Sequence, residues 1–276
     1  MCRWLGYHGS PLAPRELVHD TAHSLIEQSR RAAPDMASAN GDGVGLGWYG
    51  LGPEPALFRS DAPAWGDANL REIAGEVRSG LFLAHVRAAT GTPVQQTNCH
   101  PFRWRNWLFV HNGYVAGFGR VRRELLLAVR PDLFGGIGGS TDSELMFFLA
   151  LTFGLTEDPI GGLERMAGFV EQVGRAAGID EPLQMTVGVT DGERLYAARY
   201  ASGPVANTLF VSEEVEALRA LYPADERWRH FAGDSRAVVS EPLDDLPGLW
   251  HEVPAGTALV VQKGPDEERP FRPTPP

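Results

Sequence analysis

Lysine, cysteine and long hydrophobic runs are scarce in this sequence of 276 residues. Lys263 is the single lysine, the other basic residues are scattered arginines, and the formal net charge is −10. A chain that is acidic and has no basic tract does not favour nucleic acid or an anionic membrane as its main partner. No apolar run approaches the roughly 20 residues of a membrane span. The N-terminus also has no apolar stretch of signal-peptide length, so we expect a cytoplasmic protein.

Two cysteines, Cys2 and Cys99, are too few for a disulfide framework. Hydrophobic residues make up 43% of the chain and charged residues 22%, which is typical of a globular protein rather than a disordered one. No segment resembles a linker between domains. We therefore expect a single domain over residues 2–262, followed by a flexible, proline-rich C-terminal tail over residues 263–276.

The expected helices are grouped between blocks of expected strands and do not alternate strictly with them. Thr141 and Glu144 form a capping-box pattern at the start of a strongly apolar helix, and Asp67 is a plausible N-cap for another. This grouping favours an α+β layered fold over a doubly wound parallel sheet. Periodicity predicts helices over 15–31, 68–77, 121–129, 140–153 and 160–175, and strands over 80–86, 107–110, 184–190, 194–201, 208–211, 237–240 and 257–262.

Cys2 is the first residue with possible chemistry. If the initiator methionine is removed, Cys2 becomes the amino terminus and carries a thiol and a free amine on adjacent carbons. An α-amino group has a pKa of about 7.7–8.0, so it can act as a base without a histidine partner. A small buried residue on an edge strand would explain Cys2 equally well if it stood alone.

Three further positions could complete a site around such a nucleophile. Arg87 lies where an apolar strand enters a loop, and a guanidinium there can hold a carboxylate. Asn112 and Gly113 follow a predicted strand, and a side-chain amide with a backbone N–H is a common oxyanion hole. Asp142 lies in the first turn of a helix, where it could hold an ammonium group. Taken singly, these residues also fit a surface ion pair, an Asn-Gly turn and a helix-dipole carboxylate.

In combination they match an acyl-transfer site that recognises a free amino acid head group, and five segments carry a resemblance to a known family. The sequence resembles the class II glutamine amidotransferases of the N-terminal nucleophile hydrolase superfamily. It is similar to stand-alone members such as glutathione-degrading amidotransferase-like subunits and the γ-glutamyl hydrolase of the ergothioneine pathway. The matching segments, in the family's order, are residues 1–3, 40–45, 84–90, 111–113 and 140–144.

The resemblance implies a four-layer αββα sandwich of two antiparallel sheets, with Cys2 as nucleophile and its own amine as base. It implies that Asn112 and Gly113 form the oxyanion hole of an amidohydrolase that cleaves a γ-glutamyl amide through a thioester and releases glutamate. No metal or cofactor is expected.

The resemblance also implies a binding site for the glutamyl part of the substrate. Arg87 and Asp142 would hold its α-carboxylate and α-amino group, with Thr90 beside the carboxylate. The chain departs from the family pattern on the leaving-group side of the pocket. It has Ala88 where many members have Trp after the motif arginine, and no His follows Thr90.

Three other interpretations stay open. The chain could be a glutaminase subunit that supplies ammonia to a separate synthase, or an inactive homologue that binds a γ-glutamyl ligand and acts through a partner subunit. It could also be a metal-binding or redox module, although the spacings match no zinc pattern. The residues of that module would be Cys2, Cys99, His85, His100 and His111.

Overall fold

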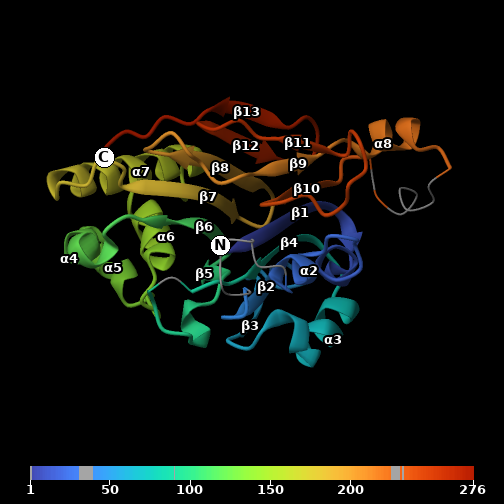
Figure 1. Cartoon of the computed structure of the whole chain (residues 1–276), viewed down its shortest axis with the longest axis horizontal. Helices are drawn as coiled ribbons and strands as arrows, with labels where there is room; N and C mark the ends of the chain where they lie inside the picture. Colours follow the sequence, from blue (N-terminus) through green and yellow to red (C-terminus); the bar gives the residue numbers. More distant parts are fainter. Residues whose placement is uncertain (1, 31–39, 90, 225–230, 232) are drawn as a thin grey trace.

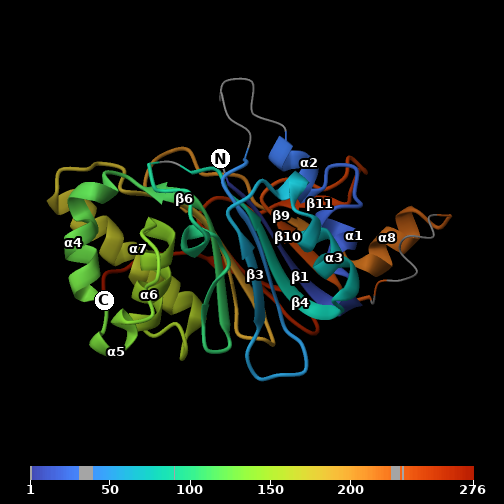
Figure 2. The same cartoon turned by 90° about the horizontal axis from the view of Figure 1, so that it is seen from below.

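The computed structural model describes residues 2–30, 40–89, 91–224, 231 and 233–276. Two antiparallel sheets lie at the centre of the described part, one face of each toward the other (Figure 1). The seven-stranded sheet has the order β11-β9-β10-β1-β4-β2-β3, and the six-stranded sheet has the order β13-β12-β8-β7-β6-β5. Helices α1–α3 and α8 lie beside the first sheet, and α4–α7 lie beside the second (Figure 2). The predicted four-layer αββα sandwich is confirmed.

The strands of the seven-stranded sheet are β1 (Arg3–Leu12), β2 (Val44–Trp48), β3 (Ala56–Ser60), β4 (Ser79–Val86), β9 (Phe210–Ser212), β10 (Arg236–Val239) and β11 (Trp250–Glu252). Those of the six-stranded sheet are β5 (Phe102–Trp104), β6 (Trp107–Val115), β7 (Leu183–Thr190), β8 (Leu195–Ala201), β12 (Thr257–Val261) and β13 (Glu267–Pro270). The α-helices are α1 (Pro14–Val18), α2 (Leu25–Arg30), α3 (Ala68–Glu76), α4 (Phe118–Ala128), α5 (Pro131–Phe134), α6 (Asp142–Thr152), α7 (Pro159–Ala176) and α8 (Val215–Leu221).

Alternation along the strands explains the layers. Successive side chains of a strand point to opposite faces, and on β6 Leu108 and Val110 pack between the sheets against Trp4, while Phe109 packs under α6. Helix α6 has apolar residues all round and is almost fully buried, as expected for a helix enclosed by a sheet and other helices. Among the described residues, no helix has both the length and the apolar character needed to cross a membrane.

Two helix starts follow the predicted capping chemistry. The Asp67 carboxylate accepts the N–H of Leu70, and the Thr141 hydroxyl accepts the N–H of Glu144. The second half of the predicted capping box is wrong, because the Glu144 carboxylate accepts the N–H groups of Gly138 and Gly139 in the preceding loop. Burial raises the pKa of this carboxyl, and the two N–H groups lower it.

The helix predicted over 15–31 is instead two short helices, α1 and α2. Ser24 causes the second start, because its hydroxyl accepts the N–H of Glu27 as an N-cap does. The tail expected over 263–276 is also not loose in the structure. Strand β13 pairs with β12, and Phe271 is buried against the ring of Tyr200, so one aromatic side chain anchors a polar segment.

Candidate active site

A cavity of about 650 Å³ lies where β1 begins and β4 ends. Its wall includes Cys2, Arg87, Gly113 and Asp142, which come from four separate segments of the chain. A site of this size falls within the range of ligand pockets, roughly 300–1,000 Å³. The structure thus brings together four of the six residues predicted for catalysis and substrate binding.

Cys2 directly precedes β1 and is held against the end of β4. The N–H of Ala88 donates to Cys2 Sγ at 3.4 Å, and the thiol donates to the carbonyl oxygen of Ala88 at 3.5 Å. Burial raises the pKa of the Cys2 thiol, whereas the Ala88 hydrogen bond and the charge on Arg87 lower it. A thiol with a raised pKa needs a nearby base to become a nucleophile.

Arg87 is buried, and all its hydrogen-bond partners are neutral. Its guanidinium donates to the Asp42 carbonyl at 3.2 Å, to Thr92 Oγ1 at 2.7 Å and to the Pro93 carbonyl at 3.1 Å. The Asp42 carboxylate is used elsewhere, since it accepts the N–H of Ala89 at 2.8 Å. The glycine-rich turn before β2 therefore positions Arg87 through a backbone carbonyl and leaves its charge uncompensated within the described residues.

The segment 111–113 lies inside β6, which runs on to Val115, and not at a strand end as predicted. Gly113 lines the cavity and can present only backbone there. It has φ +154, and a Cβ at this position would lie 1.9 Å from the Gln184 carbonyl oxygen, so only glycine fits. Asn112 is buried and its carbonyl accepts from Thr186 and Asn207, but its side chain does not line the cavity.

Asp142 is the first residue of α6 and is held by backbone. One carboxylate oxygen accepts the N–H of Val115, and the other accepts the N–H of Ser143, both at 2.8 Å. The oxygen bonded to Ser143 N–H also accepts from the Ser143 hydroxyl at 3.4 Å, so the oxygen bonded to Val115 is the one that keeps a free lone pair for a ligand. The Ser143 hydroxyl in turn lies 2.8 Å from His111 Nδ1, which ties the helix start to β6.

Three buried histidines stand behind the cavity. The rings of His85 and His100 stack with their centroids 4.0 Å apart, and His100 and His111 line the cavity. Burial lowers the pKa of all three, that of His85 to about 3. Both ring nitrogens of His100 lack a hydrogen-bond partner within the described residues. In that same part of the chain, no three His, Cys, Asp or Glu side chains are arranged to hold a metal ion.

Two other residues with possible chemistry are Thr90 and Cys99. Thr90 lies outside the described residues. Cys99 is fully buried, its thiol donates to the Ser60 carbonyl at 3.3 Å, and burial raises its pKa to about 11. Such a thiol is a packed core residue and not a reactive group.

The cavity wall also contains residues that sequence reasoning missed. Thr92 and Pro93 hold Arg87, Ala88 holds the Cys2 thiol, and Tyr114 and Arg122 lie at the rim. The glycine-rich turn before β2 was a signal for close packing at Arg87. No sequence pattern pointed to the rim residues.

Comparison with known proteins decides the family. The model of the class II glutamine amidotransferases matches residues 17–205. The chain belongs to the class II glutamine amidotransferases. The predicted family is confirmed, and with it the class of enzyme, an amidohydrolase of the amidotransferase type.

Individual relatives in this family match nearly the whole chain. The chain is 32% identical to the probable glutamine amidotransferase DUG3 of Saccharomyces cerevisiae, over 95% of this chain and 82% of the relative. It is 30% identical to the γ-glutamyl-hercynylcysteine sulfoxide hydrolase of Mycolicibacterium smegmatis, over 92% of each protein. A solved structure of a glutamine aminotransferase class-II domain protein from Silicibacter pomeroyi superposes with a TM-score of 0.76 and 34% identity, over 99% of this chain and 100% of that one.

Proposed function

We propose that this protein hydrolyses a γ-glutamyl amide through a γ-glutamyl thioester on Cys2 and releases glutamate. One observation carries the proposal: a thiol, an uncompensated guanidinium and a carboxylate, on Cys2, Arg87 and Asp142, line one cavity. The relatives named for γ-glutamyl-hercynylcysteine sulfoxide hydrolysis and glutamine amidotransfer support the same bond type.

The glutamyl half of the substrate is a zwitterion at its α-carbon. The Arg87 guanidinium accommodates the α-carboxylate, and the buried position makes this charge-assisted pairing stronger than it would be in water. Asp142 accepts from the α-ammonium group with the lone pair left free on the oxygen that accepts the Val115 N–H. We assign Thr90 a place beside the carboxylate on the family resemblance alone.

In the first half-reaction, the Cys2 amine takes the thiol proton and the sulfur attacks the γ-carbonyl carbon. The carbonyl oxygen becomes an oxyanion, which we assign to the Gly113 N–H on the cavity wall and, on the family resemblance alone, to the side-chain amide of Asn112. Such donors contribute about 2.7–4 kcal/mol each in comparable sites. The C–N bond then breaks as the protonated Cys2 amine gives its proton to the leaving nitrogen, and a γ-glutamyl thioester remains.

In the second half-reaction, water attacks the thioester carbon. The Cys2 amine takes a proton from the water, the C–S bond breaks, and the proton returns to the sulfur. Glutamate leaves and the free thiol and amine are restored. The scheme requires removal of Met1, because a peptide bond to Met1 would abolish the basicity of this amine. An active enzyme whose intact mass still includes Met1 would contradict it.

The test is glutamate release from glutamine, glutathione and γ-glutamyl-hercynylcysteine sulfoxide by the wild type, Cys2→Ala and Cys99→Ala. Cys99→Ala is the matched control, since it removes the other thiol of the chain from the core. We expect release from at least one compound by the wild type and Cys99→Ala, and none by Cys2→Ala. Release that survives Cys2→Ala overturns the mechanism. Absence of release with binding intact would favour the inactive-homologue alternative.

A cytoplasmic location, a single domain over residues 2–262 and a partner subunit stay predictions from the sequence. If a partner subunit receives ammonia from this protein, we expect the glutaminase activity of this protein to rise when that partner is added.

A further inference from the structure

The cavity wall carries one more positive charge than the glutamyl part of a substrate can pair with. The described wall carries two guanidinium groups, on Arg87 and Arg122, and one carboxylate, on Asp142. This inference rests on the proposed function, in which Arg87 and Asp142 match the glutamyl zwitterion. One positive charge, that of Arg122, is then left without a counterpart on the substrate.

Arg122 is placed to face the cavity from α4. Phe118, Gly119 and Arg122 all line the wall, and these positions lie on one face of the first two turns of the helix. No hydrogen bond or ion pair joins the Arg122 side chain to any residue in the part of the chain that the structure describes. The N-terminal turn of a helix also carries a partial positive charge, which adds to that of the guanidinium.

Two aromatic residues accompany Arg122 at the rim. Tyr114 is 47% exposed although it is large and apolar, and Phe118 is half-buried. An exposed aromatic surface beside an unpaired guanidinium can bind a leaving group that has both an apolar part and a carboxylate. Ammonia, the leaving group of glutamine, has neither and would make no contact with these residues. Ala88 lines the cavity beside the Cys2 thiol, and its small side chain leaves room there for a leaving group.

We propose that Arg122 is a specificity-determining residue that binds a carboxylate on the leaving amine. The substrate class is then γ-glutamyl derivatives of an amino acid or peptide, and glutamine is a poor substrate. Tyr114 and Phe118 cover the apolar part of the leaving group while Arg122 holds its charge. The cavity volume of about 650 Å³ accommodates more than one amino acid residue.

The test compares matched substrates that differ only in this charge: γ-glutamylcysteine and glutathione, each as the free acid and as the C-terminal amide. The measured quantity is the acid-to-amide ratio of kcat/KM within each protein, so that the folded fraction cancels. For the wild type we expect a ratio of about five for at least one pair, the size of an ion pair at an exposed position. Arg122→Ala brings this ratio to about one, and Arg122→Glu inverts it.

Arg123→Ala is the matched control, because Arg123 is the next residue of the same helix, is exposed and does not line the cavity. It keeps the wild-type ratio. A ratio near one in the wild type, or a ratio that Arg122→Ala leaves unchanged, overturns the role of Arg122 while glutamate release still supports the proposed function. If no compound is hydrolysed, the proposed function fails, and calorimetric binding of acid and amide to Cys2→Ala still decides whether Arg122 reads the carboxylate.

Discussion

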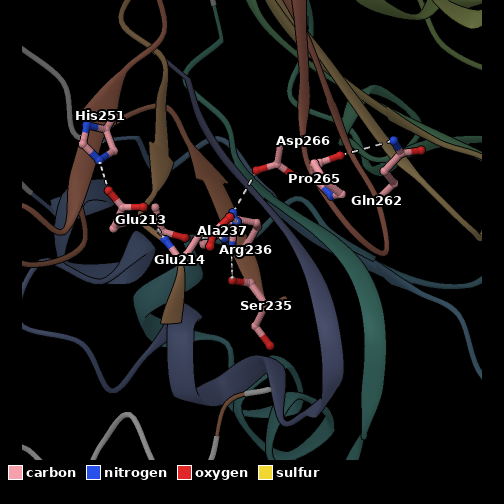
Figure 3. Close-up of polar contacts among 10 residues, drawn as sticks. Glu213, Glu214, Ser235, Arg236, Ala237, His251, Gln262, Pro265 and Asp266 are labelled. Atoms are coloured by element: carbon pink, nitrogen blue, oxygen red, sulfur yellow. Dashed lines mark hydrogen bonds and ion pairs between the residues drawn. The ribbon is translucent and has the colours of Figure 1, made fainter. Parts of the chain in front are cut away.

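Two buried arginines at opposite ends of the regularly paired stretch of β1, Arg3–His8, have opposite surroundings. Arg87 follows β4 beside the start of β1, and its partners are two carbonyls and a hydroxyl. Arg236 pairs with His8 further along β1, and it lies between the carboxylates of Glu214 and Asp266, each at 2.8 Å (Figure 3). The fold neutralises the charge of Arg236 and holds that of Arg87 in place without neutralising it.

The contrast separates structural from functional charge. Burial of a charged group is costly unless it is paired, and the pairing of Arg236 accounts for its burial. Arg87 has only neutral acceptors within the described residues and lines a cavity, which supports the proposal that a ligand carboxylate completes its pairing. Arg199, also buried, pairs with Glu252 and resembles Arg236.

The largest expected effect is that of Arg87→Met on activity. We expect kcat/KM for the preferred γ-glutamyl substrate to fall roughly 100- to 1,000-fold, because a buried charge-assisted contact with the α-carboxylate is lost. Steady-state kinetics, with the folded fraction measured by circular dichroism, checks this. Activity within threefold of the wild type would mean that Arg87 is structural.

The matched substitution at the other end, Arg236→Met, is expected to act on stability. It leaves the half-buried Asp266 without its cation, so we expect the free energy of unfolding to fall by about 2–3 kcal/mol, less than for a fully buried pair because Glu214 is exposed. Urea unfolding measures the loss. A fall in kcat per folded molecule as large as that of Arg87→Met would erase the contrast between the two ends.

The two ends are also expected to respond to acid in opposite directions. At the cavity end, burial lowers the histidine pKa values, so below pH of about 6.5 the unfolded state takes up protons that the native state does not, and stability falls as pH falls toward 3. His85, with a native pKa of about 3, contributes up to about 1.4 kcal/mol per pH unit in this window, and His100 and His111 each contribute until the native side chain takes up its own proton. At the other end, burial raises the pKa of Asp266. As the pH falls, the Asp266 carboxyl therefore takes up a proton in the native state before it does so in the unfolded state, and this group adds to the stability of the fold in acid.

Replacement of one histidine isolates this effect. His100→Phe removes two unpartnered ring nitrogens next to Phe102. We expect the slope of unfolding free energy between pH 6 and 5 to become shallower by about 1.4 kcal/mol per unit. Urea unfolding of both proteins across this range checks it, and an unchanged slope would show that His100 takes up a proton in the native state.

The smallest expected effects come from the groups that surround each arginine. Asp42→Ala removes the acceptor of the Ala89 N–H, so we expect kcat/KM to fall about fivefold through displacement of Arg87. Glu214→Ala, at the exposed partner of Arg236, is expected to cost less than about 1 kcal/mol of stability and no activity. A larger stability loss for Glu214→Ala than for Arg236→Met would be inconsistent with this account.

Local signals in the sequence predicted an α+β layered fold and the positions of a few residues of the cavity wall, and the family resemblance supplied the four-layer arrangement. The Thr141 cap places Asp142 at the start of α6, and the apolar run of β4 ends at Arg87. Long-range pairings were missed: no local pattern shows that β6 continues through 111–113, or that Phe271 docks the C-terminal strand. Arg122 was missed because facing a cavity depends on how α4 packs, and its neighbours Arg120 and Arg123 look equivalent in sequence.

The central claim is that Cys2 carries the acyl group. It is tested most directly by rapid acid quenching of enzyme with substrate, followed by intact-mass and peptide mass spectrometry. We predict a protein that lacks Met1 and carries one γ-glutamyl group, on the Cys2 peptide, with none in Cys2→Ala. A γ-glutamyl group on Cys99, or full turnover by a protein that retains Met1, would contradict the account.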